Sequence, residues 1–299
     1  MTQQPHIELS DLGFPYIPSP VLLTPNGVPY LKHSGVALIS KPQVDLSGMK
    51  DYLEGYDKEL EFPLYLEDPD ELPPAEELAK AAGQLCYQSF GPKRTHNSGG
   101  AGYLDHIKSS GHGSVFEHAN FSLLFYGIDR SVTHELVRHR AGMAYSQVSQ
   151  RYVAGKTLRF VQRPEYQNDE ELEERFIRRI EYAAREYDEI AQILLSRQKT
   201  GTSLLSGDAK TELRKKVNQA ARSVLPNETE APIIVTGNGR SWRHVLEMRA
   251  AAPAEVLIRG LGMHIFHCLA HAAPLLYQDY KVITLEDGTQ AVETKYRKV

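Results

Sequence analysis

The sequence has few cysteines: Cys86 and Cys268 are the only two in 299 residues. Two cysteines this far apart exclude a disulfide framework and a cysteine-based zinc site. Both have apolar neighbours, a setting that favours a buried, inert thiol over a nucleophile. The sequence therefore predicts a protein whose chemistry uses neither a bound metal nor a cysteine.

Long apolar runs, a basic leader and an excess of positive charge are also absent. A membrane span, which needs about 18 consecutive apolar residues, is not expected. The start Met-Thr-Gln-Gln-Pro-His lacks the features of a signal peptide. The formal net charge of −4 argues against general binding to nucleic acid. We expect a cytoplasmic protein that binds small anionic ligands through local clusters of arginine.

What the chain does contain is a mixture of predicted strands and long helices. With 41% hydrophobic residues it can bury a full core, as one large domain or two small ones. Apolar runs predict strands at 36–39, 121–126 and 233–235. Helical spacing predicts helices at 76–87, 103–109, 132–140, 170–198, 208–223, 241–252 and 253–272. The irregular order of these elements predicts an α+β fold with a mixed or antiparallel sheet.

Two segments of the chain are expected to be peripheral. Residues 1–35 contain six prolines and are expected to form an arm outside the core. The acidic segment 54–74, also interrupted by prolines, is expected to be an exposed loop or insertion. The rest of the chain, 36–299, is expected to form a single domain.

The most informative segment is 138–152, which holds three arginines, a histidine and several hydroxyl groups without an acidic residue. Arginine offers a fixed fork of donors that matches phosphate, so the segment is typical of an anion site, although a solvated basic helix end has the same composition. In a helix, Arg138 and Arg140 would point about 200° apart, which favours two ligands or one long ligand. Glu135 and Arg138 would share a face, which fits an ion pair or a joint ligand contact.

The end of this segment adds a hydroxyl to the arginines. Ser149 and Arg151 are two residues apart, so on an extended segment both would project to the same side and form a phosphate cradle. Ser149 as a nucleophile is a weaker interpretation, because no Ser-His-Asp arrangement can be assigned.

Arginine recurs beside hydroxyl or amide groups at Arg222–Ser223 and at Asn238–Ser241. The second group enters a predicted helix, whose free N–H groups and dipole would suit an anion. Along that helix Arg240, His244 and Met248 fall on one face, and Arg249 lies next to it. This helix, too, is expected to contact two ligands.

Two histidines precede the arginine segment. His112 lies in a loop flanked by glycines, where its side chain has room to meet a cofactor, although a lone histidine is a weak signal. His118 opens a predicted strand and is more typical of a structural histidine.

Taken together, these residues resemble the flavin-dependent thymidylate synthases (ThyX class). The resemblance extends from about Val36 to Val282, and its most specific part is the Arg-His-Arg triplet with its downstream serine. The motifs that carry it are Cys86-Tyr-Gln-Ser89, Ala101-Gly-Tyr-Leu104, Gly111-His112-x-Ser114-Val-x-Glu117-His118, Arg130-Ser-x-Thr-His-Glu-Leu-Val-Arg-His-Arg140, Tyr145-Ser-Gln-x-Ser149-Gln-Arg-Tyr-Val153, Ala221-Arg222-x-x-Leu-Pro226 and Asn238-x-Arg240-Ser241 followed by Met248-Arg249-Ala250.

The resemblance implies reductive methylation of dUMP at uracil C5 to give dTMP. In that reaction 5,10-methylenetetrahydrofolate would supply the carbon, bound FAD would carry the electrons and NADPH would be the reductant. The family activates uracil without an enzyme thiolate, which agrees with the cysteine content. The resemblance also implies a homotetramer whose active sites combine several subunits, which would explain why the arginines come from three segments.

The resemblance also implies roles for individual residues. Arg249 would face the uracil and favour its N3-deprotonated form, because a fixed cation stabilises a developing anion. His112 would lie near the flavin ring, and these two with Ser149 are the residues expected nearest the chemistry. Contacts to dUMP are implied for Glu135, Arg138, Ser149, Arg151, Arg222 and Arg249. Contacts to FAD are implied for Ser114, Arg138, His139, Arg140, Gln147, Asn238, Arg240 and His244.

The chain departs from the family at four places. Eight residues, Ala141 to Val148, separate Arg140 from Ser149, where the family has seven. Pro253 stands where the family has histidine, and the N-terminal arm and acidic segment lengthen the chain. Two alternatives therefore stay open: a related enzyme that acts on another pyrimidine nucleotide, for instance by hydroxymethylation, and a non-catalytic module that binds nucleotides or nucleic acid.

Overall fold

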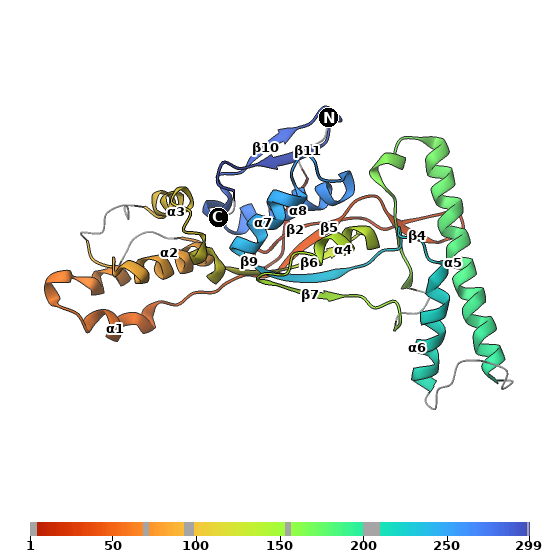
Figure 1. The fold of residues 1–299 in the computed structure, drawn as a ribbon, viewed down its shortest axis with the longest axis horizontal. Coiled ribbons are helices and arrows are strands. Elements are labelled where there is room, and N and C mark those ends of the chain that lie inside the picture. Colours follow the sequence, from red (N-terminus) through yellow and green to blue (C-terminus); the bar gives the residue numbers. More distant parts are fainter. Residues whose placement is uncertain (1–4, 68–71, 93–98, 153–156, 200–209, 298) are drawn as a thin grey trace.

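The computed structural model describes residues 5–67, 72–92, 99–152, 157–199, 210–297 and 299. Its centre is a six-stranded sheet in which every pair of neighbours is antiparallel (Figure 1). This arrangement confirms the expected α+β class with an antiparallel sheet. From edge to edge the strands are β1 (Glu8–Leu9), β2 (Pro15–Ile17), β5 (Gly35–Ser40), β6 (Asn120–Tyr126), β9 (Ile233–Asn238) and β7 (Met143–Gln147).

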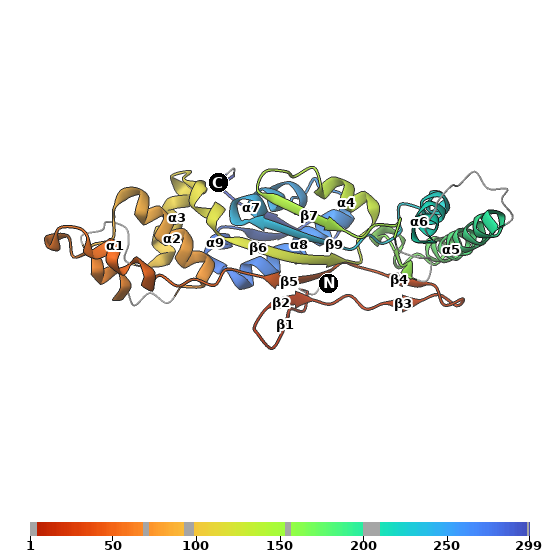
Figure 2. The ribbon, with the colours of Figure 1, turned by 90° about the horizontal axis from the view of Figure 1, so that it is seen from below.

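One face of this sheet carries the main core. Phe121, Leu123 and Phe125 alternate along β6 and are buried, as expected for a strand with one covered face. Helices α7 (Gly239–Arg249) and α8 (Val256–Ala272) cover that face, and α8 lies against β2 and β5 (Figure 2). The sheet and these two helices thus hold the start of α7 beside the ends of β9 and β7.

The N-terminal arm belongs to the core, contrary to expectation. Strand β2 pairs with β5, and Ile17 is buried in the main core. The prolines are tolerated because the strands of the arm are short and the chain turns between them. Farther along, β3 (Leu22–Leu23) and β4 (Pro29–Leu31) form a second sheet with β8 (Phe160–Val161). A domain boundary at residue 35 stays a prediction.

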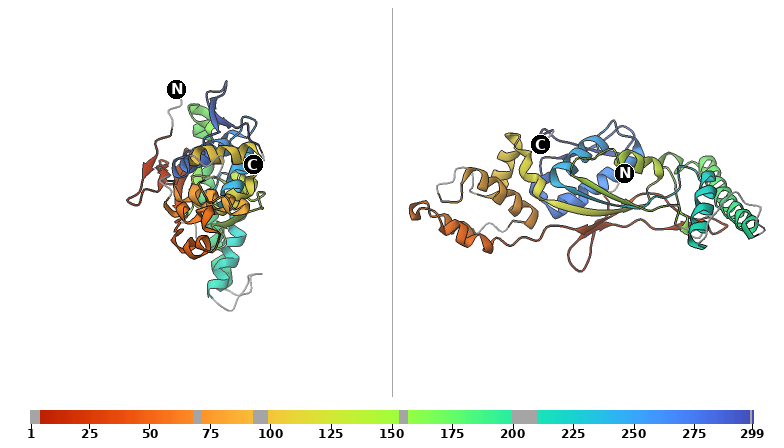
Figure 3. Two further views of the ribbon diagram at one scale, coloured as in Figure 1. Left: turned by 90° about the vertical axis from the view of Figure 1, so that its left-hand side faces the viewer. Right: turned by 60° about the horizontal axis from the view of Figure 1, so that its bottom comes forward.

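The acidic segment is a folded lobe, so the expectation of an exposed loop was wrong for the part that is described. The lobe consists of α1 (Lys50–Glu54), which ends where the acidic segment begins, and of two 3-10 helices within the segment, Lys58–Leu60 and Phe62–Glu67. Phe62 and Tyr65 pack with Leu53 into a small core against α2 (Pro74–Tyr87). This lobe lies at one end of the elongated molecule (Figure 3).

The opposite end is a pair of helices, α5 (Glu170–Lys199) and α6 (Lys210–Ala221), followed by the 3-10 turn Arg222–Val224. The bounds of α5 confirm the helix expected at 170–198, whereas residues 208–209, the expected start of the next helix, lie outside the described part. The remaining elements are α3 (Gly100–Ser109), α9 (Pro274–Tyr277), β10 (Lys281–Thr284) and β11 (Gln290–Glu293). In the described ranges, none of the helices combines the length and apolar character needed to cross a bilayer.

Helix α4 (Arg130–Leu136) ends four residues earlier than expected. Its start is capped by Asp129, whose side chain accepts a hydrogen bond from the Val132 N–H at 2.9 Å. Its end is set by a residue of the next strand: the Tyr145 hydroxyl donates to the Leu136 carbonyl at 2.9 Å. The arginine triplet therefore lies in a turn between α4 and β7, a strand that was not foreseen.

Candidate active site

The arginine triplet and the start of α7 face each other across a pocket. The pocket has a volume of about 520 Å³ and joins the loop after α4 to one side of α7. Seven residues expected from sequence to bind ligands line it together: Arg138, His139, Arg140, Asn238, Arg240, His244 and Arg249. The sequence-distant arginines of the two segments thus belong to one site.

Arg138 and Arg140 supply the free positive charge of this pocket. Both side chains are exposed, and neither has a carboxylate within ion-pair distance among the described residues. The two side chains were expected to point about 200° apart on a helix, but α4 ends at Leu136, before both of them. In the turn that follows, both line the same pocket.

N–H groups at the start of α7 already have hydrogen-bond partners in the chain. The Asn238 side chain accepts from the Ser241 N–H at 2.8 Å, and the Gly239 N–H donates to the Ala119 carbonyl at 2.7 Å. Two N–H groups at this helix start are therefore already bonded within the chain, so an anion would find fewer free donors there than expected from sequence. The Arg138 and Arg140 side chains add unpaired donors to the pocket.

Arg240 and His244 lie one turn apart on α7 and both face the pocket, as expected. The Arg240 guanidinium donates to the Glu117 carboxylate at 2.7 Å. Glu117 was not among the expected site residues, although it lies in the quoted motif that ends at His118. Met143, Glu247 and Val299 also line the pocket without having been expected.

Arg249, at the end of α7, is held by two residues of the α4 region. Its guanidinium forms an ion pair with the Glu135 carboxylate, and its Nη2 donates to the Glu135 carbonyl at 3.3 Å. Its Nε lies 3.0 Å from Nε2 of His139. Glu135 thus pairs with Arg249, 114 positions away, and not with its helix neighbour Arg138.

His139 is neutral in this arrangement. Burial, followed by the charge of Arg249 and the nearby His244, lowers its pKa to about 4. The His244 ring lies 5.3 Å from the His139 ring in an edge-on arrangement. A neutral ring can accept the Arg249 hydrogen bond, which a protonated one could not.

The expected phosphate-binding residues lie away from this pocket. Ser149 and Arg151 stand in a turn, not on an extended segment, with the Tyr152 N–H donating to the Ser149 carbonyl at 3.0 Å. The Arg151 carbonyl accepts from Asn218 on α6 at 3.3 Å, and Arg222 follows directly after α6. The site residues thus fall into two groups, one at the pocket and one beside α6.

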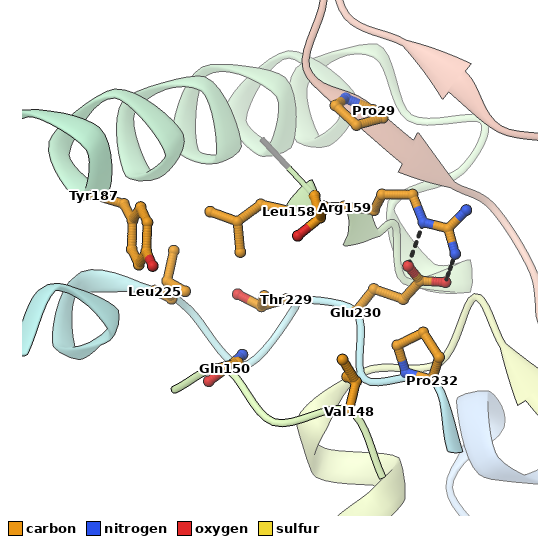
Figure 4. A pocket seen from close by; sticks show the side chains of 11 residues that line it. Pro29, Val148, Gln150, Leu158, Arg159, Tyr187, Leu225, Thr229, Glu230 and Pro232 are labelled. Carbon is orange, nitrogen blue, oxygen red and sulfur yellow. Dashed lines mark hydrogen bonds and ion pairs between the residues drawn. The ribbon is translucent and has the colours of Figure 1, made fainter. Parts of the chain in front are cut away.

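A separate cavity of about 400 Å³ lies beside this turn (Figure 4). Val148 and Gln150 form one wall, and the ion pair between Arg159 and Glu230 closes another, with Nη2 to Oε1 at 2.8 Å. None of the expected site residues lines it.

Three other expected flavin-side residues do not line the pocket either. The Gln147 side chain turns toward α4, where its Nε2 donates to Thr133 Oγ1 at 3.3 Å. Ser114 and His112 are exposed. The His112 ring is stacked on the Tyr87 ring, with 6.4 Å between the ring centroids. His118, expected to be structural, is exposed as well.

The two thiols differ from each other. Cys268 is buried, and burial raises its pKa to about 12, so it is inert as expected. Cys86 is exposed, which corrects the expectation that both would be buried. Across the described ranges, no group of three or more His, Cys, Asp or Glu side chains is arranged to hold a metal ion.

Comparison with known proteins identifies the family to which the chain is similar. Residues 70–275 match the family model described as Thymidylate synthase complementing protein (Thy1). A flavin-dependent thymidylate synthase of Mycobacterium leprae is 40% identical over 213 residues, covering 71% of this chain and 83% of that protein. One of Mycobacterium tuberculosis is 42% identical over 213 residues, covering 71% and 82%.

The fold also resembles that of a solved structure, the UMP/dUMP methylase PolB from Streptomyces cacaoi bound with 5-Br dUMP. The TM-score is 0.54 at 18% identity, and the match covers 83% of this chain and 95% of PolB. At that identity the likeness concerns the fold alone. With the family match over most of the chain and the identity to the mycobacterial enzymes, the chain belongs to the flavin-dependent thymidylate synthase family.

Proposed function

We propose that this protein methylates dUMP reductively at uracil C5 to give dTMP, with 5,10-methylenetetrahydrofolate as carbon donor, FAD as redox carrier and NADPH as reductant. The observation that carries the proposal is the pocket in which Arg249, fixed by Glu135 and His139, faces the free cations Arg138 and Arg140. A non-catalytic phosphate-binding module would have no need of a guanidinium held in this way.

The donor set of the pocket fits a flavin dinucleotide. Arg138 and Arg140 offer unpaired guanidinium groups for a diphosphate, and His139 offers an uncharged ring beside them, next to the ring of His244. Asn238, Arg240 and His244 complete the set of residues that would hold the cofactor. When bound, the flavin supplies the hydride chemistry, and the protein supplies position and charge.

Arg249 would polarise the uracil. A guanidinium has five N–H donors, and three of them are used by Glu135 and His139, so two remain for a substrate carbonyl or a deprotonated ring nitrogen. Because its partners fix the guanidinium before the substrate binds, little reorganisation is needed when negative charge develops on the ring. Arg249 is the residue to which we assign the central catalytic role.

Ser149, Arg151 and Arg222 would bind the dUMP phosphate from another subunit. These residues gather beside α6, away from the pocket that holds Arg249. A single chain therefore presents two incomplete halves, and a homotetramer with sites between subunits would unite them. His112 is exposed near Tyr87 and would lie near the flavin ring.

The proposal is tested on the purified protein. We expect it to be yellow, to oxidise NADPH faster when dUMP is present, and to release the C5 proton of dUMP with methylenetetrahydrofolate. Protein that stays colourless after addition of FAD would rule out the flavin assignment. Because PolB is described as a methylase of UMP as well as dUMP, both nucleotides should be supplied, and a product other than dTMP would identify a related enzyme with another substrate or reaction.

A further inference from the structure

The loop of residues 141–142, which joins Arg140 to β7, is hydrogen-bonded to the start of α7. The Ser241 hydroxyl donates to the Ala141 carbonyl at 2.8 Å, and the Asn238 N–H donates to the Gly142 carbonyl at 3.3 Å. Within the loop, the Met143 N–H donates to the Arg140 carbonyl at 3.3 Å. The chain that carries Arg140 is thus bonded at two points to the cap of the helix that carries Arg240.

Glycine is the residue type that fits the middle of this loop, at position 142. The φ of Gly142, +68°, lies in the left-handed region, which most side chains avoid. A Cβ at this position would also overlap Ser241 Oγ and Asn238 Nδ2, the two side chains that build the helix cap. Both of these neighbours are already committed to hydrogen bonds, so neither can move away freely.

The hydrogen bonds around this loop use three N–H groups at the start of α7, which are then not available to an anion. The Asn238 N–H is used by the loop, while the Gly239 and Ser241 N–H groups are used by Ala119 and by Asn238 itself. Arg140 stands one residue before the loop, and Arg240 stands two residues after Asn238. The distance between these two arginines across the pocket is therefore set through Ala141, Gly142 and Ser241.

We propose that Gly142 and Ser241 are positioning residues that hold Arg140 at a fixed place opposite α7, so that its guanidinium group can bind the diphosphate of the cofactor. The inference rests on the proposed flavin function for the identity of the ligand, but the positioning itself concerns any diphosphate.

The test measures binding to the full-length protein with two probes, FAD by quenching of its fluorescence and inorganic pyrophosphate by calorimetry. The variant Gly142→Ala introduces the overlap. Gly13→Ala is its matched control, because Gly13 has a φ of +71° but open space around its Cβ position. Ser241→Ala removes the hydroxyl that binds the loop, and Ser241→Thr keeps it.

We expect Gly142→Ala to raise the dissociation constant of both probes about tenfold, a change of about 1.4 kcal/mol. Gly13→Ala should leave both constants unchanged even though it strains its own turn. Ser241→Ala should weaken both probes roughly threefold to tenfold, as the loss of one hydrogen bond does, and Ser241→Thr should restore them.

Unchanged pyrophosphate binding in Gly142→Ala, with melting temperatures that show a folded protein, would overturn the inference. So would equal weakening by Ser241→Ala and Ser241→Thr. Wild-type protein that binds pyrophosphate but not FAD would instead contradict the proposed function, and the pyrophosphate series would still decide whether Gly142 and Ser241 position Arg140.

Discussion

Nε of Arg249 donates a hydrogen bond to Nε2 of His139 at 3.0 Å. Since a guanidinium can only donate, Nε2 must be the acceptor, and the proton of the neutral ring is assigned to Nδ1. Burial, and then the charge of Arg249, lowers the pKa of His139 to about 4, which keeps the ring neutral. The orientation of Arg249 therefore depends on a histidine that stays uncharged.

This relationship predicts a loss of stability in mild acid. The pKa of His139 is about 4 when folded and 6.5 in its ordinary state, so between these values the unfolded chain binds more protons. The contribution of His139 to the free energy of unfolding should be complete above pH 6.5 and should decrease as the pH falls toward 4. In His139→Gln, the decrease from pH 7 to pH 5, measured by urea unfolding, should be smaller by about 1 kcal/mol once solvent screening is allowed for.

The matched control for this prediction is His134→Gln, which replaces an exposed histidine on the neighbouring helix α4. Its pH dependence should follow that of the wild type. If the His139 and His134 variants lose the same amount of stability between pH 7 and pH 5, His139 is not the group that titrates.

Arg249 should matter more for turnover than for flavin binding. In Arg249→Lys the charge is kept, but the fork that binds Glu135 and His139, and that we propose to polarise uracil, is lost. We expect kcat to decrease by about two orders of magnitude or more, as when a fixed donor to a developing anion is removed. Flavin affinity, measured by fluorescence quenching, should change little. Equal losses of turnover and affinity would indicate that Arg249 has a structural role.

The regular elements were predictable because their signals are local. Alternating apolar residues at 121–126 and helical spacing at 170–198 appear directly in the sequence. The end of α4 was not predictable in this way, because the Tyr145 hydroxyl of a later strand binds the last carbonyl of the helix. The strands of the N-terminal arm were missed for a similar reason, since the pairing of β2 with β5 and of β4 with β8 outweighs the proline content.

The sequence predicted some of the residues that line the pocket but not the geometry that joins them. The family resemblance identified the arginines, and seven of the expected residues share one pocket. The partner of Glu135 could not be read from helix spacing, because Arg249 lies on another helix. Gly142 and Glu117 were missed. A glycine in the turn after Arg140 was a signal of the first, and an acidic residue inside a motif shared with the family was a signal of the second.

A buried carboxyl on α2 predicts the opposite pH dependence to His139. Burial raises the pKa of Glu76 to about 7, although its Oε1 accepts from the Leu276 N–H at 3.4 Å and Lys108 is nearby. The folded chain therefore binds more protons between pH 4.5 and 7, and this group stabilises the fold less as the pH rises through that range. In urea unfolding at pH 8, the free energy of unfolding of Glu76→Gln should exceed that of the wild type by about 2 kcal/mol. At pH 5 the two free energies should be nearly the same.

A suitable comparison for this prediction is Glu174→Gln, which neutralises an exposed carboxylate on α5. It should leave the free energy of unfolding unchanged at both pH values. A Glu76→Gln variant that is less stable than the wild type at pH 8 would show that the carboxylate form is favoured in the fold, through Lys108, and that burial does not dominate.

The separation of the site into two groups predicts that two inactive variants restore each other. Arg249 lies at the pocket, whereas Arg222 lies beside α6, so a site formed between subunits would take one from each chain. Arg249→Ala and Arg222→Ala should each be nearly inactive alone. When the two are unfolded, mixed in equal amounts and refolded together, roughly one site in four should contain both native arginines if subunits combine at random. The recovered dTMP synthesis, divided by that of wild-type protein treated in the same way, measures this fraction. A mixture as inactive as its components would mean that both arginines must come from the same chain, and that the turn at Ser149 reaches the pocket by a rearrangement within one subunit.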